Sequence, residues 1–248
     1  MNLATKSALV IGAGGLGGPA LLTLAAAGVG RLVIVDDDAV ETSNLNRQPL
    51  FGEADVGRRK AAAAAARVQT LYPAIRVEAL DRRFDAADAE DLVRSVDVLV
   101  DGSDNFPTKF LANDAAARAR RPLVHGGVLR TTAQLLTVVP GGLGGCLRCL
   151  FESPPAEGEV PTCAQAGVLG PVAGFAGALM GAEAARVLAG ERGAYEGRLL
   201  TFEARSARSR IVPVRRRVGC PSCAGVQALQ SSRPLPREVS SSRPGDGA

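Results

Sequence analysis

A glycine-rich turn between two short apolar runs constrains the fold of this chain more than any other sequence feature. Gly12, Gly14 and Gly17 follow the run Ala-Leu-Val-Ile at 8–11, and the run Leu-Val-Ile-Val at 32–35 comes after an intervening helical segment. Short β-branched runs of this kind are typical of strands buried on both faces of a parallel sheet. The pattern predicts a strand–helix–strand unit whose glycines let the backbone approach a phosphate at the helix N-terminus.

The same alternation of helices and strands continues along the chain. Helices are expected at 16–28, 61–71, 88–95 and 106–119, and strands at 75–80, 96–100 and 123–124. After residue 130 the rhythm changes to strands at 132–139, 198–203 and 209–214, a long surface loop at 151–168 and an Ala/Gly-rich helix at 170–188. The sequence therefore predicts an α/β fold, with a doubly wound, Rossmann-like, mostly parallel sheet and an antiparallel C-terminal extension.

Length and composition favour one large domain. The chain has 248 residues, 46% of them hydrophobic but only 4% aromatic, which suits close packing of small and aliphatic side chains. We expect one domain at 1–225, with a nucleotide-binding part at about 1–130 and the remainder at about 131–225, followed by a disordered tail at 226–248. No apolar run has the length and purity of a membrane span, and no export signal precedes the first strand, so a cytoplasmic location is expected.

Two cysteine pairs form the second strong pattern. Cys146 and Cys149 make one C-x-x-C turn, and Cys220 and Cys223 make another about 70 residues later. Two such turns can surround one ion with four thiolates, which is the ligand set that structural Zn²⁺ prefers. We therefore expect a zinc site that fastens the C-terminal segment to the main domain. The fifth cysteine, Cys163, lies in the predicted loop and is either an exposed nucleophile or a small apolar filler.

Polar residues after the strands indicate what the glycine turn holds. Asp36 ends the second strand, 19 residues after Gly17, where a carboxylate can bind ribose hydroxyls. With the glycines and Asp36 alone, NAD is the default ligand. Arg47 and Lys60 then place two cations near the turn, and a triphosphate that loses two of its phosphates needs such cations to neutralise the developing charge. Asp104 follows a strand at the edge of the sheet where a carboxylate can hold Mg²⁺.

Taken together, these motifs resemble those of the ThiF/MoeB/HesA family, bacterial relatives of the ubiquitin-activating enzymes. The resemblance extends over about residues 7–223. It is carried by both cysteine pairs and by the segments 12–17, 36–38, 43–48, 57–60, 103–105 and 162–167. It implies an ATP-dependent adenylyltransferase, a nucleotidyltransferase that acts on the C-terminal glycine of a ubiquitin-like sulfur carrier protein and releases pyrophosphate.

The resemblance also implies roles for individual residues. Asp36 would bind ribose, Asn44, Arg47 and Lys60 the phosphates, and Asp104 the Mg²⁺, with Arg47 and Lys60 as the main catalytic groups. The whole expected nucleotide site consists of Gly12, Gly14, Gly15, Gly17, Asp36, Asn44, Arg47, Gln48, Lys60, Asp104 and Asn105. No general base is required, because the attacking carboxylate is already ionised at neutral pH. In some members a cysteine matching Cys163 takes part in sulfur handling or in a covalent link to the carrier.

Further expectations concern partners. The carrier would end in Gly-Gly and serve thiamine or molybdopterin biosynthesis, and the enzyme would be a homodimer. No sulfurtransferase domain follows Cys223, so we expect a separate sulfur donor protein. Family members usually begin with a helix whose arginine reaches the γ-phosphate of the neighbouring subunit. Residues 1–6 do not supply it, so Arg58, Arg59 or a partner is expected to provide that charge.

Two other functions remain open at this point. An NAD-dependent oxidoreductase explains the glycines and Asp36 but gives no role to Arg47, Lys60 or the cysteines. A non-catalytic, zinc-stabilised protein that binds a ubiquitin-like partner is the other alternative. The region from residue 198 onward carries ten arginines against three acidic residues. A solvated surface explains this better than nucleic-acid binding, since no base-stacking aromatic surface accompanies the charge.

Overall fold

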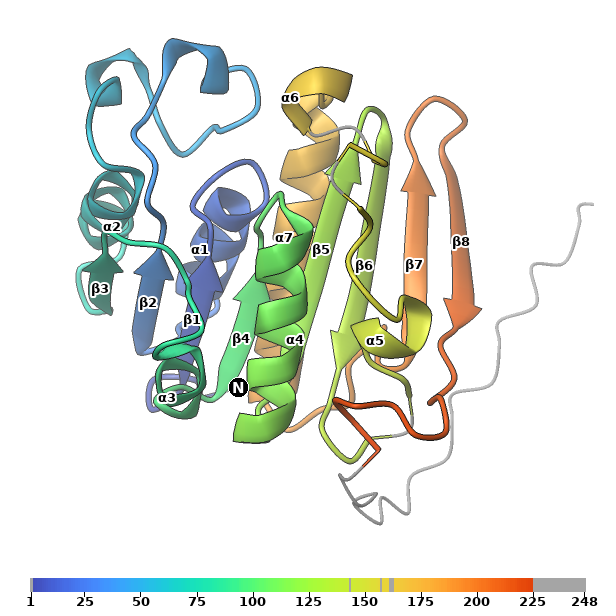
Figure 1. Ribbon diagram of the computed structural model, residues 1–248. Helices are drawn as coiled ribbons and strands as arrows, with labels where there is room; N and C mark the ends of the chain where they lie inside the picture. The colour runs from blue at the N-terminus through green and yellow to red at the C-terminus, as the bar shows by residue number, and fades with distance from the viewer. Residues whose placement is uncertain (1, 143, 157, 161–162, 225–248) are drawn as a thin grey trace, which may run out of the picture.

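The computed structural model describes residues 2–142, 144–156, 158–160 and 163–224. One eight-stranded sheet in the order β3-β2-β1-β4-β5-β6-β7-β8 forms its centre (Figure 1). The strands are β1 Ser7–Ile11, β2 Arg31–Val35, β3 Arg76–Leu80, β4 Val98–Asp101, β5 Leu123–Leu129, β6 Thr132–Val138, β7 Arg198–Glu203 and β8 Arg208–Pro213. The first five in this sequence are parallel and the last three pair in antiparallel fashion, which confirms the predicted fold class.

Helices cover both faces of the sheet. They are α1 Gly17–Ala26, α2 Lys60–Leu71, α3 Ala89–Arg94, α4 Phe106–Ala119, α5 Leu147–Leu150, α6 Cys163–Ala166 and α7 Gly170–Leu188. Alternate residues of the central strands face opposite sides, so Val10 packs in one core with α1, α2 and α7, whereas Leu9 packs in the other with α3 and α4. Both cores are almost wholly aliphatic, as the composition predicts.

Strand β5 extends well beyond the predicted residues 123–124. Gly126 and Gly127 indicate a turn in the sequence, yet both lie within the strand. A Cβ atom at Gly126 would collide with the sulfur of Met180 on α7, so glycine here permits a close approach of helix to sheet rather than a chain reversal. The consequence is that His125 lies inside a strand, opposite Asp101 of β4.

The sheet order reverses beside β1. From β1 the chain proceeds to β2 and β3 on one side, and it then crosses to β4 on the other. The carboxyl ends of β1 and β4 therefore form a topological switch point, where ligands bind in open α/β sheets. The glycine turn and Asp104 both follow these two strands, so the fold brings the predicted nucleotide residues to one edge.

The sequence also predicted that no segment spans a membrane and that the C-terminal residues form a disordered tail. Within the described residues, no helix has the length and apolar character needed to cross a membrane. The predicted disordered tail at 226–248 lies outside the described residues, as does Gly225.

Candidate nucleotide and metal sites

The glycine turn joins β1 to α1 at the switch point. Gly12 has a φ angle of 79°, which glycine adopts without steric cost. A Cβ atom at Gly17 would collide with the carbonyl oxygen of Gly12, so the turn closes on itself only with glycine at both positions. The open side of the turn faces a cleft of about 710 Å³ that Gly14 and Gly15 help to line.

Asp36 fixes the turn to the end of β2. Its carboxylate accepts a hydrogen bond of 2.7 Å from the backbone N–H of Ala13 and another of 2.9 Å from that of Asp38. Burial raises the pKa of Asp36, and these two N–H donors partly offset the effect. The carboxylate thus lies in the cleft wall at the place where a ribose is expected.

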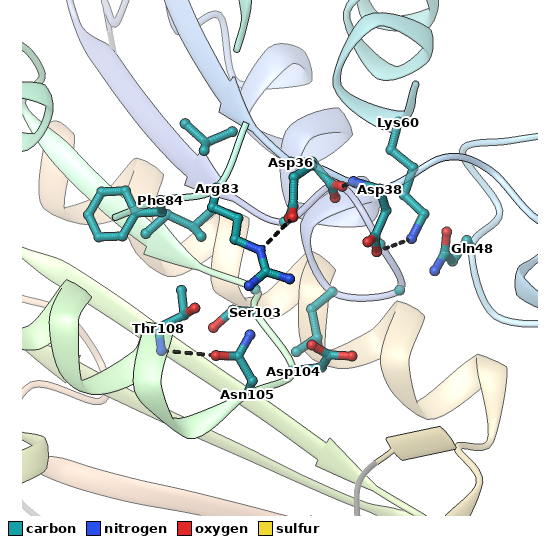
Figure 2. Close-up of a pocket in the computed structure, with 18 of the residues that line it drawn as sticks. Asp36, Asp38, Gln48, Lys60, Arg83, Phe84, Ser103, Asp104, Asn105 and Thr108 are labelled. Atoms are coloured by element: carbon teal, nitrogen blue, oxygen red, sulfur yellow. Dashed lines mark hydrogen bonds and ion pairs between the residues drawn. The ribbon is translucent and has the colours of Figure 1, made fainter. Parts of the chain in front are cut away.

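The two predicted cations both reach the cleft. Lys60 begins α2, is buried, and pairs its Nζ with a carboxylate oxygen of Asp38 at 2.8 Å (Figure 2). Arg47 is half-buried and donates to the backbone oxygen of Ser43 at 2.9 Å and to Asn46 Oδ1 at 3.1 Å. The lining of the cleft therefore offers an anionic ligand both an ammonium group and a guanidinium group.

The opposite wall follows β4. Asp104 and Asn105 are exposed and line the cleft, as predicted. The Asn105 side chain accepts a hydrogen bond of 3.0 Å from the backbone N–H of Thr108 and so caps α4 (Figure 2). The Asp104 carboxylate is accessible from the cleft, and an accessible oxygen ligand of this type suits Mg²⁺.

Not every predicted residue contributes to the cleft. Gln48 lines it, but Asn44 does not; both are buried, and Asn44 Oδ1 and Gln48 Oε1 find no hydrogen-bond partner among the described residues. Arg58 pairs with Asp55, and Arg59 pairs with Asp81, outside the lining of the cleft. The role of Arg58 or Arg59 in supplying charge to the γ-phosphate therefore stays a prediction.

Sequence reasoning missed the loop that follows β3. Arg82, Arg83 and Phe84 line the cleft opposite Lys60, and Arg83 pairs with Asp37 at 2.7 Å. Figure 2 shows Arg83 extending over the cleft beside the end of β2. These residues form no recognisable motif. The only signal is positional, because the carboxyl end of β3 lies at the same edge of the sheet as those of β1 and β2.

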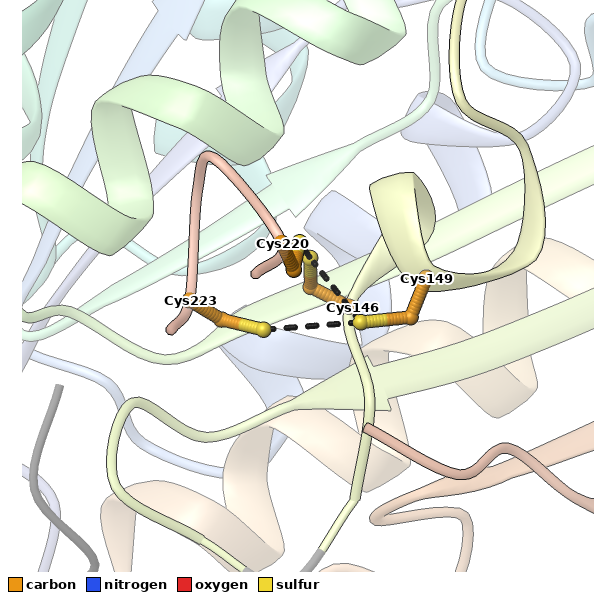
Figure 3. Close-up of side chains that lie close together, drawn as sticks. All are labelled: Cys146, Cys149, Cys220 and Cys223. Carbon is orange, nitrogen blue, oxygen red and sulfur yellow. Dashed lines mark hydrogen bonds between the residues drawn. The ribbon is translucent and has the colours of Figure 1, made fainter. Parts of the chain in front are cut away.

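The four paired cysteines converge, as predicted (Figure 3). All four sulfur atoms lie within 4.8 Å of one another. Sγ–Sγ distances are 4.0 Å for Cys146–Cys149, 3.7 Å for Cys146–Cys220 and 3.4 Å for Cys149–Cys223. Tetrahedral zinc with Zn–S bonds of about 2.3 Å requires sulfur atoms about 3.8 Å apart. The residues present therefore fit a Cys₄ zinc site.

Burial and mutual repulsion oppose ionisation in this cluster. Burial, together with the thiolates of Cys149 and Cys220, raises the pKa of Cys146 to about 11. Burial would also raise the pKa of Cys220, but hydrogen bonds from the backbone N–H groups of Cys223 and Ser222 outweigh it and lower the pKa to about 7. A divalent cation would remove the repulsion that disfavours four thiolates together.

Helix α4 connects the cysteine cluster to the cleft. Asn113 donates to the sulfur of Cys146 at 3.7 Å and accepts from the backbone N–H of Leu147 at 3.0 Å. Asp114 pairs with Arg148 at 2.7 Å, and Ser222 also donates to that carboxylate. One helix therefore caps itself at the cleft with Asn105 and holds both cysteine turns about two helical turns further on.

A second cavity of about 1150 Å³ adjoins the cleft. The two share Leu16, Ser103, Asp104 and Val128 in their linings, and strands β5 and β6 and residues from 147–155 and 159–160 line most of the rest of the second cavity. His125 and Lys109 line it as well. Arg130 and Gln134 also belong to this lining.

Asp101 is fully buried, and it is the centre of a polar network whose other members, Ser103, Lys109 and His125, line the second cavity. Its carboxylate lies 2.8 Å from His125 Nδ1 and 3.3 Å from Lys109 Nζ, and Ser103 Oγ donates to it at 2.5 Å. Complete burial alone would raise the pKa of Asp101, but Lys109, His125 and Ser103 outweigh it and hold the pKa well below its usual range.

Cys163 is the remaining predicted residue. It begins the short helix α6, which interrupts the predicted surface loop. Its side chain is outside the part of the structure that is described, so its role as a nucleophile stays a prediction.

The chain is similar in sequence to a known protein family and to several of its members. The model of the ThiF family matches residues 1–222 of the chain. The chain belongs to the ThiF family. It is 45% identical over 231 residues to the SAMP-activating enzyme E1 of Haloferax volcanii, covering 92% of this chain and 85% of that protein. It is 46% identical over 226 residues to the sulfur carrier protein adenylyltransferase of Thermus thermophilus, covering 90% and 83%.

Two other matches are covered over a smaller share of their own length, and one of them shares only the fold. The chain covers 49% of the adenylyltransferase and sulfurtransferase MOCS3 of Sus scrofa, to which it is 47% identical. A crystal structure of E. coli MccB with ATP superposes with a TM-score of 0.79 at 22% identity, covering 89% of this chain and 67% of that one. This structural likeness supports the fold of the ThiF-family chain described above.

Proposed function

We propose that this ThiF-family protein is an ATP-dependent adenylyltransferase whose second substrate is the C-terminal glycine of a ubiquitin-like sulfur carrier protein. The observation that carries the proposal is the cleft itself. It places a glycine turn, the ribose-binding candidate Asp36, the cations Arg47 and Lys60 and the carboxylate Asp104 around one space. Relatives at 45–46% identity that are named for the activation of SAMP or of sulfur carrier proteins support the same activity.

The reaction follows from these charges. A carboxylate oxygen of the carrier attacks the α-phosphorus of ATP, the bond from that phosphorus to the departing pyrophosphate breaks, and an acyl-adenylate remains. Arg47 and Lys60 would stabilise the charge on the phosphates, and positioning of the two substrates would supply most of the remaining rate. Mg²⁺ held by Asp104 would neutralise further charge on the polyphosphate.

The cysteine cluster has a structural rather than a catalytic role in this proposal. The four thiols are the ligand set of a closed Cys₄ site, which leaves no open coordination position for a substrate. Zn²⁺ bound there would fasten the end of the domain to α4. A separate sulfur donor protein, a Gly-Gly carrier tail and a homodimeric enzyme complete the proposal, in a pathway of the thiamine or molybdopterin type.

Carrier-dependent exchange of labelled pyrophosphate into ATP tests the proposal. We expect exchange with a carrier that ends in Gly-Gly and none with the same carrier lacking its terminal glycine. Calorimetric titration with ATP·Mg²⁺ and with NAD distinguishes the adenylyltransferase from an oxidoreductase. Carrier binding without any exchange would instead indicate a non-catalytic binding protein and would contradict the proposal.

A further inference from the structure

We propose that His125, oriented by Asp101, is a positioning residue that hydrogen-bonds a backbone N–H of the acceptor's C-terminal segment in the second cavity. This inference rests on the proposed function and deepens it by naming a recognition group. His125 is 5% exposed, it lines the second cavity, and its Nε2 atom has no hydrogen-bond partner in the part of the chain that the structure describes. A buried nitrogen without a partner is costly unless a ligand or a water supplies one.

The hydrogen-bonding role of Nε2 follows from its neighbours. The Asp101 carboxylate is ionised and can only accept, so the His125 nitrogen 2.8 Å away, Nδ1, must carry a proton. In the neutral imidazole, Nε2 then holds a lone pair and accepts a hydrogen bond. A peptide N–H is its complement. A terminal carboxylate is not, because it has no proton to donate at neutral pH.

The imidazole is held in one orientation. Asp101 and His125 are direct partners on the parallel strands β4 and β5. Lys109 donates to the carbonyl oxygen of Gly126 at 2.6 Å as well as pairing with Asp101, and Gly126 packs against Met180 on the other face of the sheet. Asp101 thus orients the ring and the contacts of Gly126 hold the strand that carries it, so His125 loses little conformational entropy when a ligand binds.

The shape of the second cavity suits an extended peptide end. Its walls are mainly apolar side chains, and it meets the nucleotide cleft at Ser103 and Asp104. A chain lying along β5 with an N–H bonded to Nε2 would direct its last residues toward that junction. The bond therefore sets the register of the tail, so that its carboxylate lies near the nucleotide rather than one residue short of it.

The sequence makes a direct test available, since His125 is the only histidine in the chain. In tag-free protein labelled with ¹⁵N-histidine, one imidazole gives one pair of nitrogen resonances. We expect a protonated Nδ1 before any addition. The Nε2 resonance should then shift when the Gly-Gly carrier is added, and should stay in place when ATP·Mg²⁺ is added alone. An Nε2 resonance unaffected by bound carrier would mean that only water occupies this position and would overturn the proposal.

Two variants of His125 distinguish a role in positioning the carrier tail from a role in the stability of the fold. His125→Asn keeps a polar group near Asp101 but removes the atom at the Nε2 position, whereas His125→Gln places an amide near that position. For His125→Asn we expect KM for the carrier in pyrophosphate exchange to rise roughly 10-fold, with ATP affinity unchanged within about 2-fold. His125→Gln should recover part of the loss.

The possible outcomes separate the role of His125 from the proposed adenylyltransferase function. If wild-type protein shows no carrier-dependent exchange, the proposed function fails. If wild-type protein catalyses exchange but His125→Asn keeps the wild-type KM, the function stands and the role of His125 is wrong. Equal losses of ATP affinity, carrier affinity and melting temperature in both variants would indicate a purely structural histidine and would also overturn the proposal.

Discussion

The nucleotide cleft and the cysteine cluster lie toward different parts of α4, and they use their polar groups in opposite ways. The cleft keeps its charges accessible, as the exposed Asp104 and the half-buried Arg47 show. The cluster buries Cys146 and Cys220 almost completely and surrounds them with protein donors. Groups kept available for a ligand contribute little to stability, whereas buried thiols depend on a partner to be tolerated at all. Variants in the two regions should therefore fail in different measurements.

Arg47→Ala should give the largest effect, and only on activity. Losing one preorganised cation from a site of developing phosphate charge lowers kcat roughly 10²- to 10³-fold. The melting temperature should stay near that of the wild type, since among the described residues the Arg47 side chain bonds only within its own loop, at Ser43 and Asn46. Pyrophosphate exchange and a thermal melt measure the two properties separately. Arg67→Ala, an exposed arginine on α2, is the matched control, and exchange by Arg47→Ala at the control rate would refute the role of Arg47.

Cys220→Ser should show the reverse pattern. Losing about 4 of the ~10–16 kcal/mol that structural zinc binding supplies lowers the melting temperature by about 10 °C in a chain of this size. Exchange activity measured well below the melting temperature should fall much less than in Arg47→Ala. Zinc content by metal analysis and a thermal melt provide the test. A variant that melts with the wild type and contains no zinc would show that the cluster does not stabilise the fold.

Asp101→Asn should change how the stability of the fold depends on pH, because Asp101 is fully buried beside Lys109 and His125. Its folded-state pKa lies below the unfolded value, so its ionisation stabilises the fold fully above about pH 4 and progressively less as the pH falls through the folded-state pKa. The wild type should therefore exceed the variant in free energy of unfolding at pH 7, and the gap should narrow below about pH 4. Urea titrations at pH 7, 5 and 3.5 measure the gap. Loss of zinc in acid affects both proteins and cancels in the difference.

Arg148→Met should have the smallest effect. It removes the ion pair with Asp114 and the guanidinium that lies 5.0 Å from the centre of the Phe110 ring. We expect a loss of about 1 kcal/mol, which lowers the melting temperature by roughly 2–4 °C. Arg186→Met is the matched control, because its pair with Glu191 is 3.5 Å long and about half exposed on both sides. A control that loses as much stability as Arg148→Met would show that the contact with α4 has no special value.

The sequence predicted the cleft well where each residue acts next to its own strand. The glycine turn, Asp36 and Asp104 all follow strands whose apolar runs are unambiguous, and parallel strands bring such residues to one edge. Prediction failed where position depends on contacts between distant segments. Glycine pairs are typical of turns, so the sequence did not predict that β5 continues through His125 and Gly126. Only the packing of Met180 against Gly126 explains why glycine lies within this strand. Arg83 reaches the cleft only because β3 lies beside β2.

The cysteine cluster was predictable for a different reason. Four thiols in two C-x-x-C turns are typical of a metal site in a protein without disulfides. This chemistry predicted that the two pairs lie together, although about 70 residues separate them in the sequence. Its supporting contacts were not predictable. Asn113, Asp114 and Arg148 form ordinary helix and turn sequences, and only the packing of α4 against α5 shows that they hold the two cysteine turns together.

The two outermost strands have a consequence for how this protein behaves in a crowded solution. Any sheet that ends leaves a row of backbone donors and acceptors onto which a foreign strand can add. The central strands β1, β2 and β4 are mostly aliphatic. The border strands β3 and β8 carry charged side chains such as Arg76, Glu78, Arg208 and Arg210, and most of β8 is exposed. An added strand would have to desolvate these charges. The charges on β3 and β8 therefore oppose the addition of further strands to either edge of the sheet.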